Sequence, residues 1–186
     1  MKVTPTELPE VLLLEQAVFR DSRGYFMETY NQREFREATG LDVHFVQDNH
    51  SRSARGVLRG LHFQLPPHAQ GKLVRVAAGR VFDVAVDLRR SSERYRKWAG
   101  IELSAENLRQ LWIPPGFAHG FLVLSESADL LYKTTEFFAP AFEQTLRWND
   151  KSIGIQWPLE SGRPPLLSDK DAAAPSFAEL TVGQFV

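Results

Sequence analysis

Short stretches in which apolar and polar residues alternate recur along this chain, and this period of two constrains the fold more than any other feature. Two such stretches lie between residues 72 and 88 on either side of Ala78 and Gly79, where we expect a hairpin turn. Further strands are expected at residues 56–64, 110–113, 120–124 and 130–137. Many short strands without alternating helices favour a mainly β protein, either a sandwich or a jelly-roll barrel, over a parallel α/β sheet.

One segment carries the signals of a helix. Asn31 is suited to cap its start, Glu34 stands three residues later, Phe35 offers an apolar contact and Gly40 supplies a stop. The whole chain, residues 1–186, fits one domain of ordinary size. Residues 161–178 are rich in proline, serine, aspartate and alanine, and we expect the C-terminal segment, residues 161–186, to pack on the barrel.

The charge balance and the missing cysteines exclude several classes of protein. With 22 basic and 23 acidic side chains and no block of like charge, the chain has no electrostatic footprint for nucleic acid or an anionic membrane surface. The absence of cysteine excludes disulfides, thiolate nucleophiles and thiolate metal sites. No apolar run approaches the ~20 residues that span a bilayer. We therefore expect a cytoplasmic protein whose partner is a small molecule.

Three side chains able to take part in proton transfer fall on strand faces that should point inward. In the strand at residues 56–64, period two places His62 on one face with Leu58, Gly60 and Gln64, and Gly60 should clear space beside the imidazole. Lys72 shares a face with Val74 and Val76, and Tyr132 shares one with Leu130 and Thr134. Each residue also has a purely structural explanation: a core histidine, a lysine whose stem lies on apolar surface, or an ordinary strand tyrosine.

A base, a cation and a phenol in one dry interior suit proton abstraction beside a carbonyl group. A metal site is the alternative, because histidines in a β-barrel also describe proteins in which a His-x-His pair, a carboxylate and a later histidine bind a metal. Here the corresponding stretch is His62-Phe63-Gln64, and only His119 resembles the second half of that pattern. Two histidines and an amide make a poor site for a transition metal, so we expect no metal.

Seven blocks of sequence, in order and at characteristic spacing, together resemble the dTDP-4-dehydrorhamnose 3,5-epimerase family. The resemblance extends over roughly residues 1–178. Its blocks are residues 21–28 (DSRGYFME), 47–51 (QDNHS), 56–64 (GVLRGLHFQ), 70–74 (QGKLV), 114–121 (PPGFAHGF), 132–135 (YKTT) and 167–171 (LSDKD). The resemblance implies a mainly β, cupin-type jelly-roll barrel with a few short helices. It also implies a homodimer that acts on dTDP-4-dehydro-6-deoxy-D-glucose in dTDP-L-rhamnose synthesis, without metal or organic cofactor.

Catalytic roles follow from the same resemblance, residue by residue. His62 would be the base and Asp169 its orienting partner, Lys72 would hold the C4 oxygen as enolate charge develops, and Tyr132 would deliver a proton from the opposite face of the sugar. Arg23 and Arg59 would meet the diphosphate, with Lys170 nearby. Other contacts with nucleotide or sugar are expected from Glu28, Gln47, Asn49, His119 and Glu143, with Phe19 and Phe138 as stacking surfaces for thymine.

Two other functions remain open from the sequence. Some relatives of this family epimerise only C3 or only C5, and they can carry His62, Asp169 and Tyr132 as well. A protein that binds sugar nucleotides without catalysis would need the binding residues but not the complete set of base, cation and acid. The presence of that complete set favours the enzyme.

Overall fold

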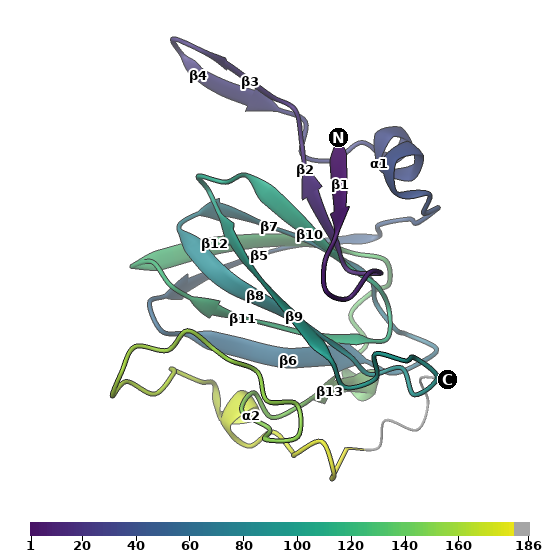
Figure 1. The fold of residues 1–186 in the computed structure, drawn as a ribbon, viewed down its shortest axis with the longest axis vertical. Helices are drawn as coiled ribbons and strands as arrows, with labels where there is room; N and C mark the ends of the chain where they lie inside the picture. Colours follow the sequence, from purple (N-terminus) through teal and green to yellow (C-terminus); the bar gives the residue numbers. More distant parts are fainter. Residues whose placement is uncertain (181–186) are drawn as a thin grey trace.

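Two antiparallel β-sheets face each other in the computed structural model, which describes residues 1–180 (Figure 1). The first sheet has the strand order β1-β2-β10-β7-β12-β5. Its strands are β1 (Lys2–Pro5), β2 (Leu12–Glu15), β10 (Arg109–Ile113), β7 (Lys72–Ala78), β12 (Ser127–Thr134) and β5 (Gln47–Ala54). The second sheet has the order β13-β6-β11-β8-β9. Its strands are β13 (Glu143–Thr145), β6 (Leu58–Gln64), β11 (Phe117–Val123), β8 (Arg80–Asp87) and β9 (Trp98–Ser104).

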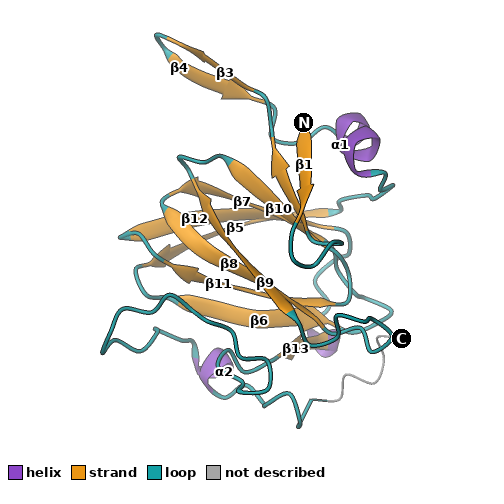
Figure 2. Cartoon of the chain, in the orientation of Figure 1, coloured by secondary structure: helices purple, strands orange, loops and turns teal. Residues whose placement is uncertain are grey.

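Helices are few and short, as Figure 2 shows. They are α1 (Gln32–Thr39), α2 (Asp169–Ala172) and a 3-10 turn at Pro140–Phe142. A separate two-stranded hairpin, β3 (Val18–Asp21) and β4 (Gly24–Met27), extends away from both sheets (Figure 1). This architecture confirms the predicted cupin-type jelly roll, mainly β with a few short helices. None of the helices in residues 1–180 is long and apolar enough to cross a membrane.

The predicted hairpin at Ala78 and Gly79 is wrong. β7 belongs to the first sheet and β8 to the second, so this turn carries the chain from one sheet to the other instead of joining two paired strands. Gly79 has φ 74°, and a Cβ at this position would lie 2.0 Å from the carbonyl oxygen of Ser127. A tight corner against another backbone therefore requires glycine here. Alternation predicts both strands correctly but does not say which strand each one pairs with.

The core lies between the two sheets, where inward side chains of both are almost fully buried. It includes Val74, Val76, Leu111 and Leu130 from the first sheet, with Val81, Ala85, Leu103 and Phe121 from the second. The outer face of the second sheet is also apolar and is covered by later parts of the chain. This second cluster contains Leu61, Val84, Val86, Leu146, Ile153 and Leu180.

The outer face of the first sheet is covered at one end by α1. The side chain of Asn31 accepts hydrogen bonds from the backbone of Arg33 and Glu34, and Gly40 ends the helix with φ 73°. Phe35 is buried against Trp112 of β10, with ring centroids 5.8 Å apart. The predicted start, apolar contact and stop of this helix are confirmed.

The predicted C-terminal packing segment, residues 161–186, is described as far as residue 180. Leu166 exchanges backbone hydrogen bonds with Gly56 and Leu58 at the start of β6, and Leu180 packs against the outer face of the second sheet. Residues 181–186 lie outside the described residues. The single-domain organisation of the whole chain stays a prediction.

Candidate active site

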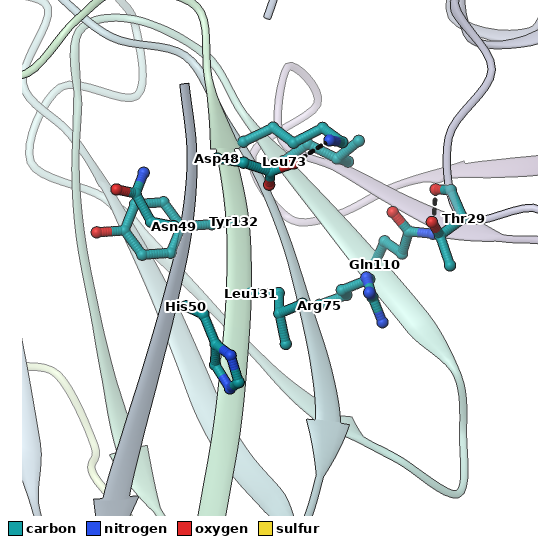
Figure 3. Close-up of a pocket in the computed structure, with 10 residues that line it drawn as sticks. Thr29, Asp48, Asn49, His50, Leu73, Arg75, Gln110, Leu131 and Tyr132 are labelled. Carbon is teal, nitrogen blue, oxygen red and sulfur yellow. Dashed lines mark hydrogen bonds and ion pairs between the residues drawn. The ribbon is translucent and has the colours of Figure 1, made fainter. Parts of the chain in front are cut away.

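Lys72 and Tyr132 come from neighbouring strands of the first sheet and face its interior. In the β7–β12 ladder, Lys72 lies opposite Thr134 and Tyr132 lies opposite Val74, so both side chains share the face of the buried core residues. Asn49 of β5 lies opposite Tyr132. In Figure 3 the side chains of Asn49 and Tyr132 lie together, on the other side of the strands from Leu131 and Arg75. The predicted inward direction of Lys72 and Tyr132 is confirmed.

His62 faces the same interior from the second sheet. It lies opposite His119 of β11, and the register between β6 and β11 then shifts before Arg59 meets Phe121. Because of this irregularity, Arg59 and His62 both turn toward the first sheet: Arg59 Nε donates to Ser53 Oγ at 2.9 Å. Simple period two would have placed them on opposite faces.

Gly60 has a different role from the predicted one. Its φ is 123°, and a Cβ at this position would lie 2.5 Å from Cα of Gly120 on β11. Glycine therefore permits a close backbone approach between β6 and β11 at the register shift. It does not serve simply to clear space beside the imidazole.

Asp171, and not the predicted Asp169, pairs with His62. His62 Nε2 lies 2.6 Å from Asp171 Oδ1, and Ser168 Oγ donates to Asp171 Oδ2 at 2.8 Å. Asp171 is buried, whereas Asp169 is exposed at the first turn of α2. Side chains two positions apart on a helix differ by about 200° in direction, so only one of these two carboxylates can face β6.

The charge state of Asp171 fixes the tautomer of its partner. Burial alone would raise the pKa of Asp171, but hydrogen bonds from His62 and Ser168 and the charge interaction with His62 bring it below its ordinary value. An ionised carboxylate can only accept hydrogen bonds, so His62 Nε2 carries the proton that it shares with Asp171. In the neutral imidazole, Nδ1 is then the nitrogen that can accept a proton. The His62 side chain is 29% exposed, so solvent and ligands can reach it.

Lys72 is buried and contacts the backbone of the strand that carries His62. Its Nζ donates to the carbonyl oxygen of His62 at 3.2 Å. Burial lowers the pKa of Lys72 to about 8, while the negative charges of Asp83 and Glu143 oppose this change. A lysine so perturbed in a site that also holds a base is typical of a catalytic centre.

Asp83 was not singled out from the sequence. His119 Nε2 lies 2.9 Å from both carboxylate oxygens of Asp83, which is fully buried. Burial lowers the pKa of His119, against the opposing charge of Asp83. His119 was expected to contact the ligand, and in this chain its Nε2 is bound to Asp83. One feature of the sequence could have identified Asp83: it shares a strand face with Val81 and Ala85. A carboxylate buried among apolar residues requires a partner.

We call His62, Lys72, His119, Tyr132 and Asp171 the interior cluster. Of the predicted ligand contacts, Asn49, Arg59 and Glu143 lie around it: Asn49 opposite Tyr132, and Arg59 and Glu143 close enough to influence the pKa of Tyr132. Lys170 Nζ pairs with Glu143 at 2.6 Å. Gln47 accepts from the backbone N–H of Phe138 at 3.0 Å, and the ring of Phe138 is exposed.

Three predicted contacts lie elsewhere in the single chain. Phe19 and Arg23 belong to the β3–β4 hairpin, which extends away from the sheets, and Glu28 follows it. Phe19 is 66% exposed, and Arg23 pairs with its neighbour Asp21 at 2.6 Å. The chain on its own does not bring these residues to the interior cluster.

Gln64 stands where the His-x-His pattern of a metal site would have its second histidine, and in this chain it binds backbone groups. Gln64 donates to the carbonyl oxygens of His68 and Phe137 and accepts from the backbone of Ala139. Within residues 1–180 no three histidine or acidic side chains are grouped so that they could hold a metal ion.

Comparison with known proteins gives one consistent result. The model of the family described as dTDP-4-dehydrorhamnose 3,5-epimerase matches residues 5–179. The dTDP-4-dehydrorhamnose 3,5-epimerases of Pseudomonas aeruginosa and Shigella flexneri are 60% and 58% identical over 179 residues, which are 96% of this chain and 97% of each relative. A solved structure of the Legionella pneumophila dTDP-6-deoxy-D-glucose-3,5-epimerase in complex with dTDP-4-keto-L-rhamnose superposes with a TM-score of 0.94 at 45% identity, covering 98% of this chain and 96% of that one. The chain belongs to the dTDP-4-dehydrorhamnose 3,5-epimerase family.

Proposed function

We propose that this chain is an isomerase that epimerises C3 and C5 of dTDP-4-dehydro-6-deoxy-D-glucose, giving dTDP-4-dehydro-L-rhamnose in dTDP-L-rhamnose biosynthesis. One observation carries the proposed mechanism. The His62–Asp171 pair belongs to one sheet and its flanking helix, while Tyr132 comes from the facing sheet. A sugar ring between them meets a base on one face and a proton donor on the other, which is what inversion of a carbon centre requires.

The first step is removal of a proton from a carbon beside the C4 ketone. His62 Nδ1 takes the proton, and Asp171 stabilises the imidazolium that forms. The electron pair of the broken C–H bond moves onto the C4 oxygen as an enolate. The Lys72 ammonium, held between its interactions with His62, Asp83 and Glu143, stabilises that negative charge in a site of low dielectric.

The second step returns a proton from the opposite face. Burial and the charge of Glu143 raise the pKa of Tyr132 above its ordinary value, against the opposing charge of Arg59, so the phenol keeps its proton until the enolate takes it. Collapse of the enolate restores the ketone and leaves the carbon inverted. His62 then releases its proton to solvent and Tyr132 takes one up, which restores both groups. Because C3 and C5 both lie next to C4, the same groups can then serve the second centre.

Binding of the nucleotide is assigned to the residues that surround the interior cluster. The exposed guanidinium of Arg59 is suited to the diphosphate, with Lys170 adding positive charge. Asn49 is suited to a ligand oxygen, because its buried Nδ2 has no hydrogen-bond partner among the described residues. Gln47, His119 and Glu143 complete the polar contacts, and the exposed ring of Phe138 offers a stacking surface.

Part of the nucleotide site would come from a second copy of the chain. An isolated two-stranded hairpin is marginally stable in water, yet β3–β4 exposes Phe19, Tyr25 and Phe26, the last of them 69% exposed. The outer face of the first sheet also has a pocket of about 260 Å³ (Figure 3). Its lining includes Asp48, His50, Arg75 and Leu131. In a homodimer that covers this face, the hairpin of one subunit can carry Phe19, Arg23 and Glu28 to the partner's interior cluster.

The proposed reaction needs no metal and no organic cofactor, and it takes place in the cytoplasm. Product analysis tests it: the purified, chelator-treated protein is incubated with dTDP-4-dehydro-6-deoxy-D-glucose and a 4-ketoreductase that traps the inverted sugar. Trapped dTDP-L-rhamnose is the expected product. A trapped sugar inverted at one carbon would identify a single-centre epimerase, and unchanged sugar with bound nucleotide would identify a binding protein.

A further inference from the structure

The segment Glu136, Phe137, Phe138 and Ala139 follows β12 and lies outside regular secondary structure. It carries two large aromatic side chains, Phe137 at 61% and Phe138 at 52% exposure. Exposed rings on an irregular segment would ordinarily sample many positions, which is a poor basis for a ligand contact.

Three glutamine side chains hold the backbone of this segment residue by residue. Gln70 Nε2 donates to the carbonyl oxygen of Glu136 at 2.7 Å. Gln64 Nε2 donates to the carbonyl oxygen of Phe137 at 3.1 Å, and Gln64 Oε1 accepts from the N–H of Ala139 at 2.8 Å. Gln47 Oε1 accepts from the N–H of Phe138 at 3.0 Å. We call Gln47, Gln64 and Gln70 the glutamine clamp.

Gln64 is the central member of the glutamine clamp. It is 4% exposed and lies on β6 two residues after His62. Its amide also donates to the carbonyl oxygen of His68 at 2.7 Å, so one side chain joins the segment on either side of Phe138 to the loop after β6. An amide is required, because this position needs donors for two carbonyl oxygens and an acceptor for an N–H, and a carboxylate supplies only the acceptor.

We propose that Gln64 is a positioning residue that fixes the ring of Phe138 relative to His62, and so sets the affinity for the nucleotide part of the substrate. The inference rests on the proposed function, in which Phe138 contacts the ligand. The strand that carries the base also carries the side chain that holds the aromatic surface, so base and surface keep a constant separation. Holding the ring in its bound position before the ligand arrives reduces the entropy cost of binding.

Gln64→Met tests the inference, since methionine has a similar shape and cannot make the three hydrogen bonds. We expect the Kd for dTDP and the KM for the sugar nucleotide to rise about 5- to 20-fold, and kcat to stay within about threefold of wild type. Asn107→Leu is the matched control. Asn107 also makes three side-chain-to-backbone hydrogen bonds, to Ser104, Arg109 and Glu102, in the turn between β9 and β10. This control should change neither constant.

A double-mutant cycle with Phe138→Ala separates positioning from a general structural effect. If Gln64 acts through Phe138, then Gln64→Met adds no further loss of dTDP affinity in the Phe138→Ala background. Equal losses in both backgrounds, or an unchanged dTDP Kd in Gln64→Met, would overturn the inference. Should Gln64→Met fail to fold, Gln70→Met gives the same test with a smaller expected loss, because its amide holds only the first residue of the segment.

Binding of dTDP by calorimetry is measured separately from turnover. A wild-type protein that binds dTDP but does not epimerise would contradict the proposed function, and the cycle on dTDP affinity would still decide whether Gln64 positions Phe138.

Discussion

Replacing Asp171 by asparagine removes the negative charge beside His62 and changes almost nothing in size. The Oδ1 atom lies 2.6 Å from His62 Nε2, the distance of a strong charge-assisted hydrogen bond. Hydrogen bonds to charged groups contribute about 1.5–3 kcal/mol, which corresponds to roughly 10- to 150-fold in rate. An asparagine NH₂ group can also donate to Nε2, which would leave the proton on Nδ1 and abolish the base. We therefore expect turnover to fall at least about 100-fold.

The assay follows NADPH consumption by a 4-ketoreductase in excess, so that epimerisation limits the rate. Asp169→Asn is the matched control, because it makes the same chemical change two residues away on an exposed position of α2. The control should retain turnover within about twofold of wild type, as expected of a surface substitution. Near-normal turnover in Asp171→Asn, or a large loss in Asp169→Asn, would refute the pairing of His62 with Asp171.

Four further predictions concern the buried charges and the exposed hairpin. The value of kcat/KM should fall as pH rises through about 8, because the Lys72 ammonium of the free enzyme loses its proton, and a pH profile of Lys72→Arg should lack this limb. Because the pKa of Lys72 is lowered in the folded protein, burial of the charged side chain costs stability below pH 8. The contribution of Lys72 to the free energy of unfolding therefore rises between pH 8 and about 10.4, the pKa of an unperturbed lysine. Denaturant titration of wild type and Lys72→Met can measure this rise. Asp83→Asn should move the alkaline limb of kcat/KM to lower pH, because Asp83 raises the pKa of Lys72; an unmoved limb would exclude that interaction. Phe26→Ser should weaken the dimer, and sedimentation showing wild-type protein as a monomer would contradict the proposed assembly.

Alternation predicts side-chain direction well where the ladder is regular. Lys72 and Tyr132 lie on β7 and β12, whose register is uninterrupted between Leu130 and Thr134, and both face inward as period two requires. The same rule fails on β6, where the register shift brings Arg59 to the face of His62. Nothing in single-residue periodicity marks a shift that depends on the approach of a neighbouring strand.

Pairings between distant segments are the other part that the sequence leaves open. His62 and Asp171 are 109 residues apart, and the choice between Asp169 and Asp171 depends on how a four-residue helix is oriented by its cap at Ser168. The sheet change at Gly79 is likewise decided by packing, because strand propensity does not specify the partner strand. The glutamine clamp could not be predicted from the sequence for the same reason, since its bonds join β5, β6 and the loop before β7 to one segment.

The most direct test of the mechanism is deuterium incorporation, followed by NMR of dTDP-4-dehydro-6-deoxy-D-glucose in deuterated water. Wild-type protein should introduce deuterium at both C3 and C5. His62→Ala should introduce none, because the base is absent, and Tyr132→Phe should retain some exchange while losing correct inversion. Deuterium at both carbons with His62→Ala at the wild-type rate, or none with the wild-type protein, would contradict the assignment of His62 as the base that forms the enolate.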